Sequence, residues 1–317
     1  MKYSFVLPAY KAKFFKESID SILAQTYPDF ELIIVNDASP EDLDSIVASY
    51  DDPRIKYFKN KENIGGNNLV SQWNYCITLC KSDYLILSSD DDVYDPDYLF
   101  KLNKLVDKYP QVNVFRPRVR YIDSDNKITD IGGYLKEFCT DLEWLEAWVK
   151  GWIGSGIPYY IIKREALLEI GGFADYPLGW FADDATILRL LHKGIVSSSD
   201  FLFSFRVSGI SISSRRNSSQ DLKNKIIASE RYYNEVINYL HNINDSDHYS
   251  RCLNDSIMKW LPQFMQNAKI RTELFNASFI SVTSHLKQLM NLSFMSKKRV
   301  FYLYVNYLFN FFTLNNN

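Results

Sequence analysis

Residues 84–99 read YLILSSDDDVYDPDYL, a short apolar run followed by three consecutive aspartates. The run is typical of a buried strand, which we expect over 84–87. Adjacent carboxylates repel one another, and the end of a strand has no structural need of three of them. Hard divalent cations bind through one or two carboxylates, while water and substrate phosphates complete the coordination. The stretch therefore predicts a strand that ends in a site for a cation and a diphosphate.

The residues before this stretch alternate between apolar runs and helical patterns. Three further strands are expected, at 3–7, 31–35 and 55–58. Between them, apolar side chains recur at helical spacing over 15–23, 43–47 and 69–80. Strands that alternate with helices predict an α/β fold, with a mostly parallel sheet covered on both faces. We expect Ser39 to cap the second helix, because Pro40 follows it and Asp42 falls in the first turn.

Acidic residues follow two of these expected strands. Asp37 comes directly after the strand at 31–35, and residues 90–92 follow the strand at 84–87. Ligands of such sheets bind outside the carboxyl ends of the strands, so both acidic sites are expected to face one crevice. No G-x-G-x-x-G follows the first strand, and no G-x-x-x-x-G-K-[ST] occurs. Dinucleotide-binding and P-loop interpretations therefore lose their main support.

The overall composition is that of an ordinary soluble protein. The chain has 317 residues, 46% hydrophobic residues and a net charge of −2, which argues against a basic nucleic-acid binder. Its four cysteines show neither C-x-x-C pairs nor zinc spacing. The N-terminus lacks the pattern of a signal peptide, so the cytoplasm is the expected compartment. No uninterrupted apolar run is long enough for a spanning helix.

Five motifs in order resemble one known family. They are LPAY at 7–10, VNDAS at 35–39, NKENIGG at 60–66, the acidic cluster with DPDYL at 95–99, and GGFADYPLGWFADDATILRLLHKG at 171–194. Together they are similar to inverting glycosyltransferases of family 2, which have the GT-A fold. The resemblance covers residues 1–215, which we expect to form the catalytic domain.

The resemblance implies a nucleotide-diphosphate-sugar donor, a Mn²⁺ or Mg²⁺ ion, and direct displacement at the anomeric carbon. By the same resemblance, the nucleotide-contacting residues are Pro8, Ala9, Tyr10, Asp37, Asn63 and Gly65. Asp91 matches the metal-binding aspartate of the D-x-D motif, and Asp92 follows it. The first aspartate of the usual motif is Ser89 here. Either Asp90 takes over the ribose contact, or the register is shifted and Asp90 and Asp92 form the pair.

A second acidic pair is the candidate for the catalytic base. Inversion in one displacement needs a general base, and a carboxylate within hydrogen-bond reach of the acceptor hydroxyl can serve. The family's base matches Asp183 first and Asp184 second. The alternative is that these residues only cap a helix, where anions interact favourably with the helix dipole. Gly194 is expected to end that helix.

Other residues are candidates for acceptor and diphosphate contacts. Trp152 and Trp180 offer flat ring faces to an acceptor sugar, although tryptophans more often lie in the core. Arg206, Arg215 and Arg216 are candidates to neutralise the leaving diphosphate. The alternative for Arg215 and Arg216 is an exposed loop pair.

Residues 216–317 are expected to form a helical extension. It ends in a basic cluster at 297–299 that is followed by VFYLYVNYLFNFFTL. Such a segment is too short to span a bilayer but suits an in-plane interfacial helix over 297–314. Peripheral contact with the inner face of the cell membrane follows from this. The alternative is that these aromatic residues pack on the catalytic domain or on a second subunit.

The sequence thus predicts a metal-dependent transferase of hexosyl or N-acetylhexosaminyl groups. The donor would be a UDP-, GDP- or dTDP-linked sugar, and the acceptor a glycan or lipid-linked glycan in polysaccharide biosynthesis at the cell envelope. One rival is a nucleotidyltransferase, but the first turn lacks the glycine-rich loop typical of that class. The other rival is a catalytically silent homologue that binds a glycan or a protein partner.

Overall fold

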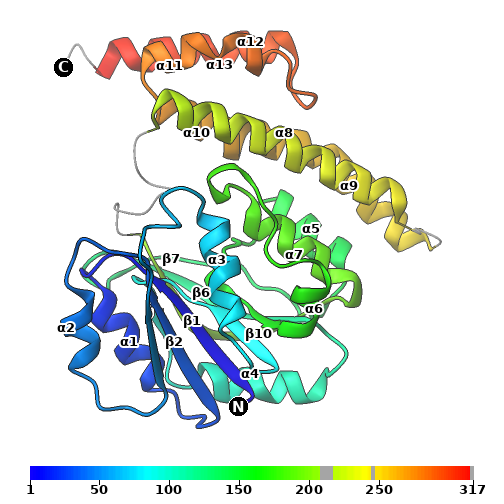
Figure 1. Ribbon diagram of the computed structural model, residues 1–317. Helices are drawn as coiled ribbons and strands as arrows, with labels where there is room; N and C mark the ends of the chain where they lie inside the picture. The colour runs from blue at the N-terminus through cyan, green and yellow to red at the C-terminus, as the bar shows by residue number, and fades with distance from the viewer. Residues whose placement is uncertain (208–216, 244–246, 315–317) are drawn as a thin grey trace. The chain divides into compact units, whose positions relative to one another are not determined.

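The computed structural model describes residues 1–207, 217–243 and 247–314, with the side chains of 311–314 left aside (Figure 1). The chain divides into two compact units. The first, called here the sheet unit, comprises Met1–Trp148, Trp152–Asp175 and Ala182–Ser208. The second, the helical unit, comprises Val149–Gly151, Tyr176–Phe181 and Gly209–Asn317. The domain boundary expected at residue 215 lies outside the described residues.

The sheet unit contains a ten-stranded sheet, in the order β3-β2-β1-β4-β9-β6-β10-β5, with β7 on β6 and β8 on β10. The strands are β1 (Tyr3–Ala9), β2 (Phe30–Asn36), β3 (Ile55–Lys59), β4 (Tyr84–Leu87), β5 (Val93–Tyr94), β6 (Val114–Ile122), β7 (Ile128–Ile131), β8 (Phe138–Cys139), β9 (Ile161–Lys163) and β10 (Ile195–Arg206). The first four strands are parallel, as predicted. The sheet is mixed because β9 runs antiparallel to both β4 and β6.

The predicted α/β architecture is confirmed, and the helices follow the strands as expected. In the sheet unit they are α1 (Phe15–Leu23), α2 (Leu43–Ala48), α3 (Leu69–Thr78), α4 (Tyr98–Lys108), α5 (Asp141–Val149), α6 (Arg164–Glu169), α7 (Ala182–Leu190) and the 3₁₀ turns η1 (Ile157–Tyr159) and η3 (Leu191–Lys193). Gly194 follows η3 with φ +78°, so the predicted end of this helix is also confirmed. A glycine adopts this left-handed conformation without steric cost.

The prediction of Ser39 as the cap of α2 is wrong. The cap is Asp42, whose Oδ1 accepts a hydrogen bond from Ser45 N at 3.0 Å. The Ser39 hydroxyl instead donates to Tyr10 O at 2.5 Å and accepts from Glu41 N at 3.0 Å. Ser39 therefore ties the turn after β2 to the turn after β1, and the helix begins three residues later than expected.

The central strands are buried along their length, which explains their continuous apolar sequences. Every residue of β2 is buried, and so is every residue of β1 except Pro8. Strands covered on both faces need apolar side chains at successive positions. Within these two strands, the Ser4 hydroxyl donates to Glu31 Oε1 at 2.6 Å near the amino ends. At the carboxyl ends, Asn36 is the last residue of β2, Asp37 follows it, and Ser88 follows β4. These ends form the edge of the sheet that carries the candidate site.

The helical unit is built around a long helix, α8 (Ser219–Asn242), which begins with a capping box between Ser218 and Asp221. The other elements are η2 (Pro177–Gly179), α9 (His248–Phe264), the π-helix η4 (Met265–Ile270), α10 (Arg271–Phe275), α11 (Phe279–Ser284), α12 (Leu286–Leu289) and α13 (Lys297–Leu314). Inside it, Lys225 Nζ lies 2.6 Å from Glu273 Oε2, and both side chains are buried. None of the described helices combines the length and apolar character needed to cross a bilayer.

Candidate active site

Asp37 organises the loop that follows β3. Its main-chain N donates to Ala9 O at 3.0 Å, which joins the ends of β1 and β2. Its carboxylate accepts three hydrogen bonds from the loop: Oδ1 from Asn60 Nδ2 at 2.7 Å and Ile64 N at 2.9 Å, and Oδ2 from Gly65 N at 2.7 Å. A carboxylate offers about four lone-pair positions. Asp37 therefore retains little capacity for the contact with a nucleotide base that the resemblance implies.

The loop over 60–66 is built to fit around this carboxylate. A Cβ atom at Gly65 would lie 2.8 Å from Asp37 Oδ2, so a side chain there would displace the loop. Asn63 Oδ1 accepts from Gly66 N at 2.6 Å and closes the turn. Beneath it, Gln72 Oε1 accepts from Asn60 Nδ2 at 2.9 Å. Asn63 and Gly65 thus have structural roles here, and their predicted nucleotide contacts stay predictions.

Asp90 fastens the acidic cluster to the turn after β1. Its Oδ2 accepts from Tyr10 N at 2.9 Å and from Lys11 N at 2.8 Å. Burial raises the pKa of Asp90, although these two hydrogen bonds oppose the rise. The turn after β1 is also joined to Asp37 through Ala9. Both acidic sites therefore flank the same turn, as the strand order β2-β1-β4 requires.

Asp92 is fully buried and bound by protein groups on both carboxylate oxygens. Oδ1 accepts from Arg206 N at 2.8 Å, and Oδ2 accepts from the Ser89 hydroxyl. Burial and the charge of Asp91 raise the pKa of Asp92 to about 8. Ser89, the departure from the family pattern, thus supplies the donor that holds Asp92 inside the fold. Both carboxylate oxygens of Asp92 are thus engaged by the protein, and its predicted metal contact stays a prediction.

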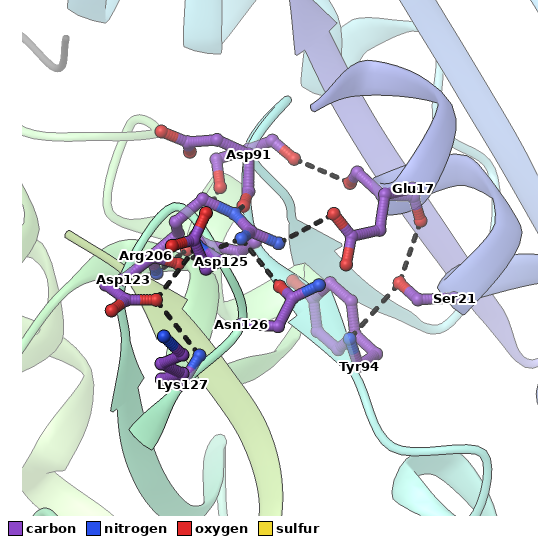
Figure 2. Close-up of polar contacts among 12 residues, drawn as sticks. Glu17, Ser21, Asp91, Tyr94, Asp123, Asp125, Asn126, Lys127 and Arg206 are labelled. Carbon is purple, nitrogen blue, oxygen red and sulfur yellow. Dashed lines mark hydrogen bonds and ion pairs between the residues drawn. The ribbon is translucent and has the colours of Figure 1, made fainter. Parts of the chain in front are cut away.

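Arg206 holds the main chain of the cluster in place (Figure 2). Its Nε donates to Asp91 O at 2.7 Å, and its Nη2 donates to Glu17 Oε2 at 2.9 Å. Its Nη1 donates to Asn126 Oδ1 at 2.6 Å and to Asp123 O at 3.1 Å, in the turn between β6 and β7. Figure 2 shows these partners converging on the guanidinium from three separate parts of the chain. Arg206 therefore joins β10, α1 and the β6–β7 turn to the acidic cluster.

The burial of Arg206 bears on its predicted contact with a diphosphate. The residue is 1% exposed, and its guanidinium carbon lies 4.2 Å from the centre of the Phe14 ring. With its nitrogens directed at protein oxygens, Arg206 serves here to position the cluster. Its contact with a leaving diphosphate stays a prediction, and Arg215 and Arg216 lie outside the described residues.

Asp183 and Asp184 lie in the first turn of α7, as predicted. Asp183 is half-buried, and its Oδ1 accepts from Asp184 N at 2.9 Å. Asp184 is 5% exposed. Asp183 is therefore the more accessible carboxylate of the pair. Negative charge in the first turn of a helix interacts favourably with the helix dipole.

Two consecutive tyrosines link the two acidic groups. Burial raises the pKa of Tyr159, and the charge of Asp92 adds to that rise. Burial also raises the pKa of Tyr160 to about 12, and the charges of Asp184 and Asp183 add to the rise. Tyr94, two residues beyond Asp92, also donates a hydrogen bond to Pro158 O at 3.2 Å. The stretch that carries the two tyrosines is thus in contact with the strand that follows the acidic cluster.

The two predicted acceptor tryptophans have different surroundings. Trp152 is 58% exposed, and its main chain passes so close to Gly133 that a Cβ atom there would lie 1.8 Å from Trp152 O. Trp180 belongs to the helical unit, where Lys225 Nζ lies 4.3 Å from the centre of its ring. The indole of Trp152 therefore suits sugar stacking better than that of Trp180.

The family model for glycosyl transferase family 2 matches residues 4–157. The match covers just under half of the chain, so it is residues 4–157 that are similar to this family. The matched residues include the β1 turn, Asp37, the 60–66 loop and the acidic cluster. Asp183 and Asp184 lie beyond the match, so their part in the family's chemistry stays a prediction.

Curated relatives are named as glycosyltransferases. A glycosyltransferase of Rickettsia typhi is 41% identical over 110 residues, which are 33% of this chain and 33% of that protein. A glycosyltransferase of Rickettsia felis is 35% identical over 137 residues, which are 39% of this chain and 22% of that protein. The chain thus spans a third or less of these relatives' length.

Solved structures of similar fold extend the comparison over the whole chain. The crystal structure of S. aureus TarS 1–349 has a TM-score of 0.66 at 15% identity, and the likeness covers 96% of this chain and 83% of that one. The mannosyltransferase PcManGT from Pyrobaculum calidifontis, in complex with GDP-Man and Mn²⁺, has a TM-score of 0.52 at 14% identity, with coverage of 98% and 87%. At this identity the likeness establishes the shared GT-A fold and nothing of the substrates.

In the described part of the chain, side chains alone do not supply a full set of ligands for a divalent cation. Among the residues that the structure describes, no three His, Cys, Asp or Glu side chains form a group that could hold a metal ion. Asp90 and Asp92 are engaged with protein donors, and the predicted role of Asp91 as a metal ligand stays a prediction. A cation held by one carboxylate and completed by diphosphate oxygens and water fits this arrangement.

We expect Asp37→Asn to release the 60–66 loop. An amide group cannot accept the same three hydrogen bonds, and leaving buried donors unpaired costs about 1–3 kcal/mol. The Ile64 and Gly65 amides should then exchange with solvent about 5- to 150-fold faster, as measured by native-state hydrogen exchange. Asp51→Asn, at an exposed position, is the control for lost charge. Unchanged exchange in Asp37→Asn would show that the loop does not depend on this carboxylate.

Proposed function

We propose that this protein is an inverting glycosyltransferase that uses a nucleotide-diphosphate sugar and a divalent cation. The observation that carries the proposal is the way Asp91 is held at the carboxyl end of β4. Its neighbour Asp90 is bound by the turn after β1, and its neighbour Asp92 is bound by Arg206 N and Ser89. The similarity of residues 4–157 to glycosyl transferase family 2 supports the same activity.

In this proposal Asp91 holds a Mn²⁺ or Mg²⁺ ion. The ion, when bound, supplies positive charge that stabilises the leaving diphosphate. The presence of Mn²⁺ with GDP-Man in the PcManGT structure supports the choice of a divalent metal. Asp90 and Asp92 then act by fixing the main chain, so that Asp91 is presented in one orientation.

The proposed base is Asp183. It takes the proton from the acceptor hydroxyl as that oxygen attacks the anomeric carbon from the face opposite the diphosphate, which inverts the configuration. The transferred group is a hexosyl or N-acetylhexosaminyl group, and the exposed Trp152 ring offers a face for the acceptor glycan. The structure of TarS with UDP-GlcNAc supports the inclusion of UDP-sugars among the donors to be tried.

The turn after β1 is the proposed nucleotide contact, through Pro8, Ala9 and Tyr10. Tyr10 is 40% exposed, and its main chain is fixed on both sides, by Asp90 and by the Ser39 hydroxyl. A fixed turn with an exposed aromatic ring suits stacking on a base. Asp37, which follows the neighbouring strand β2, has a remaining lone pair that would accept a hydrogen bond from the nucleotide base.

Metal-dependent nucleotide binding tests which aspartate of the cluster binds the metal. With manganese and each of UDP, GDP and dTDP, we expect one nucleotide to raise the thermal midpoint, since a ligand at 100 times its Kd stabilises by about 2.7 kcal/mol. Asp91→Asn should abolish the shift. Asp92→Asn should keep most of it, because an amide can still accept from Arg206 N and donate to Ser89. The opposite pattern would place the metal on Asp92.

Transfer kinetics test the base. With the nucleotide sugar so identified and a panel of glycan acceptors, Asp183→Asn should lower kcat by about 10²- to 10⁴-fold, because general-base catalysis contributes that much. The KM for the donor should stay the same. Asp184→Asn is the matched control at the buried neighbour and should retain far more activity. Nucleotide binding without transfer by the wild-type protein would instead favour the silent homologue.

A second proposal concerns α13, which we infer lies in the surface of an anionic membrane. One side of the helix packs inside the helical unit through Val300, Leu303 and Tyr307. The other side exposes apolar side chains one turn apart, with Phe301 69% and Val305 43% exposed. Lys297 and Lys298 at its start are exposed as well. An apolar stripe beside cations complements anionic lipid, and an acceptor linked to lipid would lie at that surface.

Vesicle sedimentation tests this membrane contact. Phe301→Ser/Val305→Ser should abolish binding to phosphatidylglycerol-containing vesicles, while Ile227→Ser, at an exposed position of α8, should leave it unchanged. Lys297→Gln/Lys298→Gln should weaken binding by about 10- to 30-fold, since each lysine near the surface contributes about 1 kcal/mol. Equal binding of all variants, or none by the wild-type protein, would remove the proposal.

A further inference from the structure

The chain leaves the sheet unit between residues 176 and 181 and enters the helical unit, a segment called here the excursion loop. Its two ends are tied together within the sheet unit by Thr186. The Thr186 hydroxyl accepts from Ala174 N at 2.9 Å, before the loop, and donates to Ala182 O at 2.6 Å, after it. These two hydrogen bonds hold the ends of the loop together in the sheet unit, whereas residues 176–181 themselves pack within the helical unit.

The excursion loop adopts a conformation that L-residues avoid. Leu178 has φ +60° and Phe181 has φ +68°, and Gly179 between them has φ +67°. Bulky residues in the left-handed region are outliers, because Cβ comes too close to the following carbonyl oxygen. Such a conformation persists only where surrounding contacts fix it.

The contacts that fix the loop come from α8, within the helical unit. The Phe181 ring stacks on the Tyr232 ring, with 4.7 Å between centroids and 7° between planes. Tyr176 donates a hydrogen bond to Glu235 Oε2 at 2.5 Å. Lys225, whose charge is paired with Glu273, covers the Trp180 ring. These three positions of α8 span about three turns and face the loop together.

The loop leads directly to the proposed base. Phe181 is followed by Ala182, the first residue of α7, and Asp183 is the next residue. We propose that α8, through the stack of Tyr232 on Phe181, fixes the excursion loop and thereby the first turn of α7 that carries Asp183. Tyr232 is thus a positioning residue for the transfer reaction. This rests on the proposed function only for the role of Asp183 as the base.

The experiment compares substitutions at neighbouring positions of α8. Tyr232→Ala removes the ring from the stack, Tyr232→Phe keeps it, and Tyr233→Ala removes a ring that packs 5.0 Å from Phe294 instead. Native-state hydrogen exchange of the amides over 178–185 reports the loop and the first turn of α7 without need of activity. Steady-state kinetics of the full chain report kcat and the donor KM.

We expect Tyr232→Ala to accelerate exchange over 178–185 by at least about tenfold and to lower kcat by about 10- to 100-fold with the donor KM unchanged. Tyr232→Phe should restore both values, and Tyr233→Ala should change neither. Phe181→Gly provides a second comparison, because glycine adopts φ +68° freely and should disturb the turn less than Phe181→Ala.

Two results would overturn the inference. Unchanged exchange in Tyr232→Ala would show that α8 does not fix the loop, and faster exchange with unchanged kcat would show that the loop does not position Asp183. A wild-type protein without transfer activity would count against the proposed function instead. The exchange data would then still decide whether Tyr232 fixes the first turn of α7.

Discussion

The hydrogen bonds that fasten three adjacent aspartates to the surrounding fold are the interaction on which the rest of the site depends. Ionised carboxylates at consecutive positions repel one another, and burial makes each charge more costly. Main-chain N–H groups of Tyr10 and Lys11 offset this for Asp90, and Arg206 N and Ser89 do so for Asp92. The two outer carboxylates thus hold the surrounding chain together.

Arg206 extends this arrangement beyond the cluster. A guanidinium buried in the protein must be paired and hydrogen-bonded, or its desolvation would destabilise the fold. Glu17 provides the opposite charge, and the β6–β7 turn provides neutral oxygens. The last strand, the first helix and a hairpin thus converge on one side chain. A shift of any of these elements would move the Arg206 side chain and therefore Asp91 O, which accepts a hydrogen bond from Arg206 Nε.

Several features of the site were absent from the sequence interpretation for a physical reason. The partners of Arg206 lie 80 to 189 positions away in the chain, and no local pattern marks them. The sequence also did not predict that residues 176–181 belong to the helical unit, because that assignment depends on which residues pack together in the folded chain. The prediction that Ser39 caps α2 was wrong, because its hydroxyl donates to Tyr10 O, a partner distant in sequence that local capping rules do not consider.

The sequence by itself determined the order of strands and helices, the carboxyl-end placement of Asp37 and the acidic cluster, and the resemblance to glycosyltransferases of family 2. These depend on periodicity and on motifs, which are local properties of the chain. The tertiary structure decided that protein donors hold Asp90 and Asp92, and that Arg206 is buried. Burial and hydrogen-bond partners are properties of residues distant in sequence, and only the folded chain brings them together.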